Sequence, residues 1–275
     1  MIEQTALTDR ATLTRHRSRA TADALFLHAA LADEVDERLR EINRTFTDVA
    51  IVTGHPVFWQ DRFPDALVVE DAETLALETR SRDLVVHAMA LHWANDPVGQ
   101  LVQCRRALRP DGLLLVGCFG GQTLQELRVA LAEAESVVTG GLSPRIAPMG
   151  EIRDLGALLQ RAGLALPVAD AFTLTATYQT AFHLMRDLRA MGEANALEAR
   201  LRTPTRRDVM TEAASVYATH FADDQGRVPA TFEIIVLTGW APDDSQPQPL
   251  RPGSATARLS DALGAVETPL DPTEH

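Results

Sequence analysis

The chain has 275 residues, 45% of them hydrophobic and 23% charged, which suits one large α/β domain with room for an insertion or a tail. Its formal net charge of −12 argues against a protein that binds nucleic-acid phosphates. All 26 residues counted as lysine or arginine are arginine, so Schiff-base chemistry and pyridoxal-phosphate catalysis on a lysine are excluded.

Signals for export or for a membrane span are missing from the sequence. Two scattered thiols, Cys104 and Cys118, cannot form a disulfide framework and are typical of a reducing compartment. No stretch approaches the roughly eighteen apolar residues of a membrane span, and the charged start "MIEQTALTDRATLTRHRSR" has no apolar signal core. We therefore expect a cytoplasmic protein.

The first part of the chain predicts helices followed by strands. Residues 1–48 are expected to be helical, because apolar residues recur there at helical spacing. Strands are expected at 48–52, 65–71 and 82–91, the last with the continuous apolar character of a strand buried on both faces. The apolar residues of the helical pattern are Leu27, Leu31, Val35, Leu39 and Ile42.

Residues 95–119 form the clearest unit. Asn95 is expected to cap a helix that has Pro97 in its first turn, where the missing N–H has no cost. The turn "RPDG" should end this helix and lead into the strand 113–119. Strand, helix, turn and strand make a βαβ crossover, so its two strands should be parallel neighbours.

The rest of the chain predicts further helices and two more strands, and we expect a doubly wound, mostly parallel α/β sheet with a small helical cap inserted before the last strand. The expected organisation is a helical segment at 1–48, the main domain at 49–240 with its insertion at about 178–221, and a mobile tail at 241–275. The expected elements are helices beginning near Leu124 and at 151–163, 180–192 and 206–221, a loop at 139–150, and strands at 172–178 and 228–241.

The stretch "DLVVHAMALHWANDPVGQLVQCRRALRPDGLLLVGCFGGQTLQELR" resembles the later part of class I S-adenosylmethionine-dependent methyltransferases. Within that superfamily the chain resembles the branch of the mitochondrial complex I assembly factor 5 and its bacterial relatives, a cousin of the biotin-pathway malonyl-carrier-protein methyltransferase. Downstream strings strengthen this match: "GGLSPRIAP", "DLGALLQRAG", "DLRAMGEANAL", "VYATHF", "VPATFEIIVLTGW" and "RPGSATARLSDAL". The similarity runs from about Asp83 to Leu263 and is weaker at 7–48.

The resemblance implies a Rossmann-like sheet of seven strands that binds its cofactor at the carboxyl ends of the first strands. It also implies a role in assembling the respiratory NADH:quinone oxidoreductase, and in the mitochondrial case modification of an arginine on a core subunit. We expect the sheet to be truncated in its first half. Thr53 to Val68 would have to hold a turn, two helices and the second strand, whereas a βαβ unit needs roughly 30 residues.

A cofactor site of this class needs a glycine-rich turn after its first strand, and here that turn reads "TGHP". Gly54 is its one glycine, and Pro56 has no N–H to offer. Asp71 follows a strand where the family has its adenine-side acid, although it could equally cap the next turn. Glu70 or Asp71 would hold the ribose if that strand were the family's second. The cofactor-side residues that we predict are Thr53, Gly54, Asp71, Ala72 and His87.

The missing glycines and ribose-binding acid should weaken cofactor binding. Losing two hydrogen bonds to charged partners costs about 3–6 kcal/mol. That loss lowers affinity by roughly two to four powers of ten. S-adenosyl-L-methionine therefore stays possible as a cofactor, with weak or no binding expected.

No catalytic residue is identified outright, and the candidates are His92 and Gln122. His92 follows a strand where doubly wound sheets bind ligands, so it could accept a proton, with Trp93 as a stacking wall. Trp93 could equally pack a helix on the sheet. Gln122 stands where relatives commonly have an acid. The substrate-side residues implied by the resemblance are Trp93, Asn95, Gly121, Glu126, Arg128, Met191, Glu193 and Thr231.

These substrate-side residues also have plainer explanations. Glu126 and Arg128 could be a solvated pair on a helix surface, and "MGEAN" and "PATF" could be a turn and a packed strand. The histidines and cysteines show no metal-ligand spacing, and no Gly-x-Ser-x-Gly nucleophile motif is present.

Two hypotheses follow. In the first, which we favour, the chain binds a subunit of the respiratory NADH:quinone oxidoreductase, or an active relative, and its cofactor site is degenerate. In the second, it is a working S-adenosylmethionine-dependent methyltransferase or arginine-modifying enzyme with a compact site. A carrier-protein methyltransferase is a third, weaker alternative.

Overall fold

A computed structural model describes residues 6–247 and Gly264 of the chain. Internal contacts group Met1–Asp243 as one compact unit and Asp244–His275 as another. Most of the predicted tail lies outside the described residues, so its mobility stays a prediction. Within the described part of the chain, no helix is both long and apolar enough to cross a membrane.

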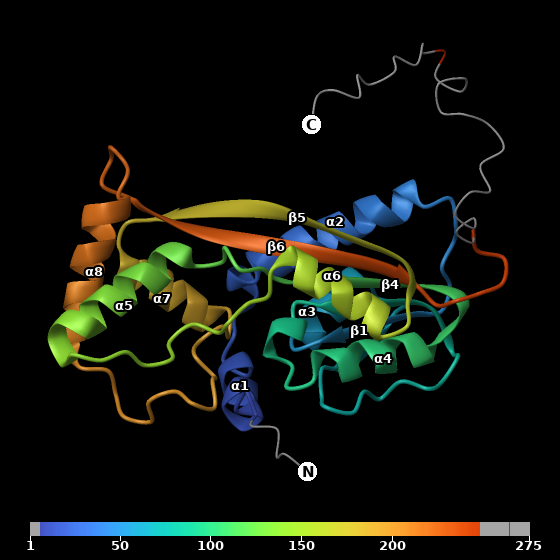
Figure 1. Cartoon of the computed structure of the whole chain (residues 1–275), viewed down its shortest axis with the longest axis horizontal. Coiled ribbons are helices and arrows are strands. Elements are labelled where there is room, and N and C mark those ends of the chain that lie inside the picture. Colours follow the sequence, from blue (N-terminus) through green and yellow to red (C-terminus); the bar gives the residue numbers. More distant parts are fainter. Residues whose placement is uncertain (1–5, 248–263, 265–275) are drawn as a thin grey trace, which may run out of the picture. The chain divides into compact units, whose positions relative to one another are not determined.

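The centre of the first unit is a mixed sheet in the order β2-β1-β3-β4-β6-β5 (Figure 1). Neighbours from β2 to β4 are parallel, whereas β6 is antiparallel to both β4 and β5. The predicted doubly wound, Rossmann-like fold of a class I methyltransferase is confirmed, with six strands in the described residues instead of seven. The strands are β1 Val49–Thr53, β2 Leu67–Glu70, β3 Arg82–Ala88, β4 Leu108–Phe119, β5 Ala165–Tyr178 and β6 Val228–Trp240.

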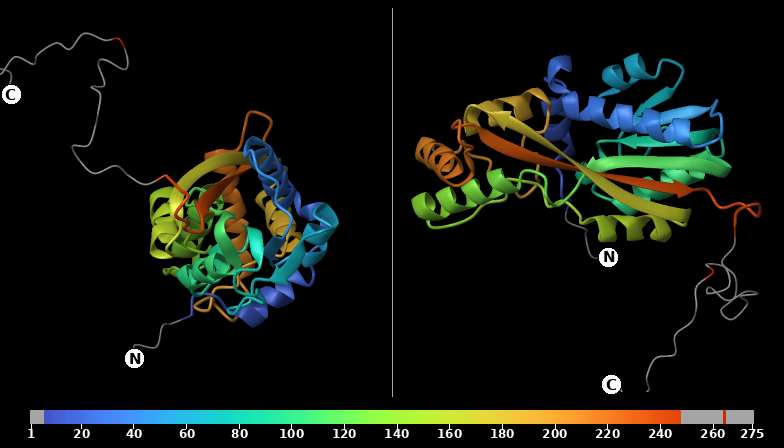
Figure 2. Two further views of the ribbon diagram at one scale, coloured as in Figure 1. Left: turned by 90° about the vertical axis from the view of Figure 1, so that its right-hand side faces the viewer. Right: turned by 90° about the horizontal axis from the view of Figure 1, so that it is seen from above.

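Helices cover both faces of the sheet (Figure 2). Side chains alternate along β3, so Leu84 and Val86 join the core that contains α2, whereas Val85 joins the opposite core with Leu101 and Leu159. The helices are α1 Arg10–Arg17, α2 Phe26–Glu41, α3 Pro56–Arg62, α4 Pro97–Ala107, α5 Gln125–Thr139, α6 Ile152–Arg161, α7 Ala181–Ala190 and α8 Arg207–Phe221, with short 3₁₀ turns η1 Ala22–Ala24 and η2 Leu91–Trp93.

The segment that connects β1 to β2 in the parallel half of the sheet has few residues, as the sequence predicts. The seven-residue helix α3 is the only regular element between β1 and β2. The four-residue β2 then pairs directly with β1, with Glu70 in register with Thr53. An apolar hollow of about 220 Å³ remains between α2 and this part of the sheet, lined by Val35, Ile51 and Val86 among others.

Two local predictions are wrong. Asp96, and not Asn95, caps α4, because its side chain accepts the Gly99 N–H at 2.8 Å. Asn95 is occupied elsewhere, since its Oδ1 accepts the Thr8 N–H at 2.8 Å. The residues "RPDG" do not form a separate turn, because β4 begins directly after α4 and includes them, with Asp111 at φ 59°.

The antiparallel half extends beyond the parallel half. β4 pairs with β6 only between Ile234 and Trp240, while β5 pairs with β6 back to Val228. The remaining β5–β6 ribbon reaches the region of α5, α7 and α8 (Figure 1). The strand predicted at 172–178 is therefore the end of a longer strand.

Candidate functional site

The carboxyl ends of β1 and β2 open into a cleft of about 1170 Å³. Ligands of doubly wound sheets commonly bind at this edge, because loops and helix ends converge there. Gly54 and His55 follow β1 and line the cleft, as do Glu70 and Asp71 at the end of β2. Helix α1 contributes Arg17 to the same wall.

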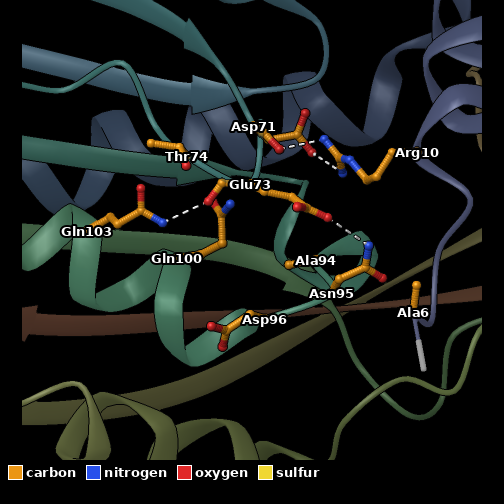
Figure 3. A pocket seen from close by; sticks show the side chains of 10 residues that line it. All are labelled: Ala6, Arg10, Asp71, Glu73, Thr74, Ala94, Asn95, Asp96, Gln100 and Gln103. Atoms are coloured by element: carbon orange, nitrogen blue, oxygen red, sulfur yellow. Dashed lines mark hydrogen bonds and ion pairs between the residues drawn. The ribbon is translucent and has the colours of Figure 1, made fainter. Parts of the chain in front are cut away.

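A second cleft of about 410 Å³ lies between the loop after β2 and the start of α4 (Figure 3). Its polar lining is already engaged in local hydrogen bonds. Gln103 Nε2 donates to the Glu73 carbonyl at 2.9 Å, and Asn95 Nδ2 donates to the Glu73 carboxylate at 3.2 Å. Asp71 and Arg10 line both clefts, so the contact between these two residues lies at the boundary between the clefts.

Asp71 is bound by two arginines of α1. Arg17 Nη1 lies 2.8 Å and 2.9 Å from its two carboxylate oxygens, and Arg10 Nη1 lies 3.2 Å from one of them. Only 6% of Asp71 and 7% of the Arg17 side chain are exposed. Burial raises the pKa of Asp71, but Arg17 and Arg10 outweigh it and hold the pKa below its ordinary value. The carboxylate is therefore charged and already paired.

Local sequence explains why α1 lies across this edge. Asp9 caps the helix by accepting the Thr12 N–H at 2.9 Å, and Arg200 Nη2 donates to the same carboxylate at 2.8 Å. Leu13 packs in a small apolar cluster with Trp93. These contacts orient α1 so that its arginines reach the sheet.

Gly54 allows Arg17 to approach the backbone. A Cβ at this position would collide with the Arg17 guanidinium, so any larger residue would have to displace the end of this side chain. The next helix starts with Pro56, which cannot donate an N–H. The one glycine of the "TGHP" turn thus accommodates a side chain of the protein itself.

A buried polar cluster extends inward from the cleft. We define it as Arg17, His28, His55, His92 and Glu193. The ring centres of His28 and His55 are 4.7 Å apart, and His92 Nε2 lies 3.5 Å from Glu193 Oε2. Arg17 Nε and Nη2, His55 Nε2 and Glu193 Oε1 have no hydrogen-bond partner within the described residues.

Burial sets the charge of His28 and His55, whereas polar contacts set the charge of Glu193. Burial lowers the pKa of His28 and of His55 below the ordinary histidine value, so both rings are neutral at pH 7. Burial raises the pKa of Glu193, yet the contacts with His92, Arg17 and the Trp93 indole outweigh it and bring the pKa to about 2. Glu193 is therefore a buried anion, and the Trp93 Nε1–H donates to it at 2.7 Å.

The predicted cofactor-side residues separate into two sets. Thr53, Gly54, Asp71 and Ala72 lie together at the ends of β1 and β2. His87 lies within β3, fully buried, with its Nε2 3.1 Å from the Gln100 amide oxygen. It lines neither cleft.

The predicted catalytic and substrate-side residues also fall into separate regions. His92, Trp93 and Glu193 contact one another beneath α1, as described above, and Asn95 lines the smaller cleft. Met191 is buried in the main core. The remainder, Gly121, Gln122, Glu126, Arg128 and Thr231, lie where α5 meets β6.

The α5–β6 group forms structural contacts. Glu126 accepts the Thr231 N–H at 3.2 Å and also its hydroxyl. Arg128 Nη1 donates to the Gly121 carbonyl at 3.3 Å, and Gln122 is exposed with its backbone N–H bound to Glu233. These residues line neither of the two clefts.

Several residues of the site were not predicted from the sequence, namely Arg10, Arg17, His28 and Gln100. The only sequence signal was the weak family likeness at 7–48, which contains three of the four. Among residues 6–247 and Gly264, no group of three or more His, Cys, Asp or Glu is arranged to hold a metal ion.

Comparison with known proteins shows similarity to methyltransferases and to the arginine-hydroxylase NDUFAF5. The model of a methyltransferase domain matches residues 37–116. The mitochondrial arginine-hydroxylase NDUFAF5 of Danio rerio is 35% identical over 252 residues, which are 92% of this chain and 72% of that protein. The human protein of the same name is 38% identical over 78% of this chain, and the match spans 61% of its length.

More distant matches were also found. A malonyl-[acyl-carrier protein] O-methyltransferase of Xylella fastidiosa is 37% identical over 65% of this chain and 58% of its own length. Among solved structures, the YcgJ protein of Bacillus subtilis is 11% identical, with a TM-score of 0.46 over 73% of this chain and 94% of that one.

Proposed function

Because this chain belongs to the family of the mitochondrial arginine-hydroxylase NDUFAF5, we propose that it works by binding a partner and that its own first helix closes its cofactor site. One observation carries this proposal. Asp71, the best candidate for a cofactor-binding acid, is buried and bonded to Arg17 and Arg10 of α1. A nucleoside would have to displace these arginines to reach it.

The residues fit S-adenosylmethionine poorly. Its ribose needs a carboxylate free to accept hydrogen bonds, and its own carboxylate needs backbone N–H groups. Asp71 is engaged, Gly54 is covered by Arg17, and Pro56 has no N–H. Breaking a buried ion pair costs about 3–5 kcal/mol. That cost would weaken binding by roughly two to four powers of ten.

The partner that family membership supports is a subunit of the respiratory NADH:quinone oxidoreductase, or an active relative of this chain. The net charge of −12 favours a partner with a basic face. We further propose a cytoplasmic location, at the surface of the inner membrane while the complex assembles.

Calorimetric titration of the full chain with S-adenosylmethionine tests the closed site. We expect no saturable heat up to about 1 mM, which is the range to which the ion-pair cost would move a micromolar site. Arg10→Ala/Arg17→Ala should gain measurable binding, because it frees Asp71. Saturable binding of the wild-type chain near 10⁻⁶ M, on the order of an intact site, would contradict the proposal.

Affinity capture tests the binding role separately. The immobilised full chain should retain a purified core subunit of the oxidoreductase, and added S-adenosylmethionine should not change the amount retained. Retention that requires the cofactor would point to a catalytic complex.

A second candidate is an S-adenosylmethionine-dependent methyltransferase or arginine-modifying enzyme, and Glu70 favours it. This residue ends the strand beside β1, is exposed, and lines the larger cleft. A free carboxylate at the end of this neighbouring strand could hold ribose hydroxyls. In that case Glu70→Gln should abolish cofactor binding, whereas Val57→Ala on the same cleft should not. The malonyl carrier-protein reaction is less well supported, since that relative matches a smaller share of this chain.

A further inference from the structure

The outer side of β5 is a long open strand edge. β5 has 14 residues and pairs with β6, and no other strand of the described residues pairs with it (Figure 1). Edge strands are usually protected by short length, charges or proline. Residues 171–178, "AFTLTATY", carry neither a charge nor a proline. This segment is therefore an available template for strand pairing.

The bonds made by β6 show which β5 groups face outward. In an antiparallel pair, residues that exchange hydrogen bonds alternate with residues that do not. The carbonyls of Glu233 and Thr231 accept backbone N–H groups from segment 120–124 at 2.9 Å and 2.7 Å, away from β5. Thr173 and Thr175 stand opposite these two residues. Their own N–H and C=O groups therefore point to the open edge.

Two copies of this edge are complementary in an antiparallel register centred on Leu174. Thr173 of one copy then stands opposite Thr175 of the other, and the two exchange backbone hydrogen bonds. On the other face Phe172 stands opposite Ala176, so a large side chain meets a small one. Cross-strand threonine pairs and apolar pairs of this kind stabilise sheets. No charged side chains are brought opposite each other within 171–177.

We propose that a second copy of this chain docks on the β5 edge and forms a two-fold dimer with one continuous sheet. Arg227 Nη2 donates to the Thr177 carbonyl at 2.6 Å, which marks the end of the pairing segment. The charge of −12 on each copy opposes association, so added salt strengthens the dimer. This inference goes beyond the proposed function and does not depend on the cofactor site, because β5 and β2 are opposite edges of the sheet.

Two double variants with matched positions test this register. Thr173→Lys/Thr175→Lys puts lysines opposite each other at both pairs, whereas Thr173→Glu/Thr175→Lys puts opposite charges there. Both side chains are exposed, so the fold of each copy should be unchanged by circular dichroism. Sedimentation of the full chain from roughly 1 to 100 µM should show a wild-type dimer. The lysine pair should weaken it at least about tenfold, and the charge-paired variant should restore it.

Thr175→Pro provides an independent variant, because its N–H points away from β6 and proline is tolerated at such edge positions. It should also yield a monomer. A wild-type chain that sediments as a monomer at about 0.5 M salt overturns the proposal. Equal dimerisation of the two charge variants, or a dimer that survives Thr175→Pro, overturns it as well, since the interface would then lie elsewhere.

Discussion

At the scale of single residues, the site is dominated by the buried ion pair between Arg17 and Asp71. Removing two charges from water is costly, and their attraction offsets that cost only when the geometry is good. Arg17 Nη1 contacts both oxygens of Asp71, and Arg10 adds a second bond. Such a pair is sensitive to the loss of one partner but much less to the loss of both.

Asp71→Ala should therefore destabilise the fold by about 3–5 kcal/mol, because Arg17 would stay buried without its anion. Arg17→Met/Asp71→Leu should recover most of that loss, because no buried charge is left at this position. Urea unfolding of the three proteins measures the difference. A double variant as unstable as Asp71→Ala would show that packing, and not charge, is responsible.

The buried polar cluster should make stability depend on pH in two windows. The folded-state pKa values of His28 and His55 are lowered, mainly by burial. Their contribution is complete above the unfolded pKa of about 6.5 and is lost as pH falls below it. Glu193 has a folded pKa of about 2 against an ordinary 4.5, so its contribution is lost between those values.

Urea unfolding at a series of pH values between about 7.5 and 4.5 measures the first window. Each histidine can contribute up to about 1.4 kcal/mol per pH unit. His28→Gln should flatten the curve, since an amide can still accept the Trp59 indole N–H that His28 accepts at 3.1 Å. An unchanged slope in His28→Gln would contradict this assignment.

At the scale of elements, α1 lines the larger cleft and binds Asp71 although it is only eight residues long. A helix this short is not stable alone and depends on its cap and on tertiary contacts. Asp9 supplies both, since it caps α1 and also binds Arg200 and Arg202. Loss of Asp9 should therefore loosen α1 before the sheet is affected.

Hydrogen exchange followed by mass spectrometry tests this dependence. Asp9→Ala should raise the exchange rate of α1 amides at least about tenfold, with β1 and β3 unchanged. Asp96→Ala removes the equivalent cap from α4 and should raise exchange there instead. Equal exchange of α1 in both variants would rule out a specific role for Asp9.

The same elements show what the sequence could and could not predict. β3 and β6 were predictable because continuous apolar runs identify buried strands. The sequence predicts Asn95 as the N-cap of α4, whereas the N-cap is Asp96. Both side chains can cap a helix, but Asn95 Oδ1 already accepts the N–H of Thr8, which is distant in the sequence. The contact of Arg17 with Asp71 joins positions 54 residues apart, which no periodicity reveals.

At the scale of the whole molecule, the short connection before β3 coincides with a difference in side-chain packing between the two faces of the sheet. The face under α2 keeps a hollow of about 220 Å³ that Val86 lines, whereas Val85 on the opposite face is fully buried in the core with Leu101 and Leu159. Neighbouring residues of β3 therefore lie in different packing environments.

Substitution of adjacent valines tests this difference with the same added methylene. Val86→Ile points into the hollow and should stabilise the fold by about 0.5–1 kcal/mol. Val85→Ile enters the filled face and should cost about 1–3 kcal/mol. Urea unfolding compares the two, and equal effects would mean that the hollow closes in solution.

Two of the three tryptophans donate an indole hydrogen bond to a residue of the buried polar cluster. Trp59 donates its indole N–H to His28, and Trp93 donates to Glu193. Indole fluorescence depends on the polarity and charge around the ring, so displacement of α1 by a ligand or a partner should shift the intrinsic emission. The protein thus contains its own optical reporter for the opening of the cleft, and no attached dye is required.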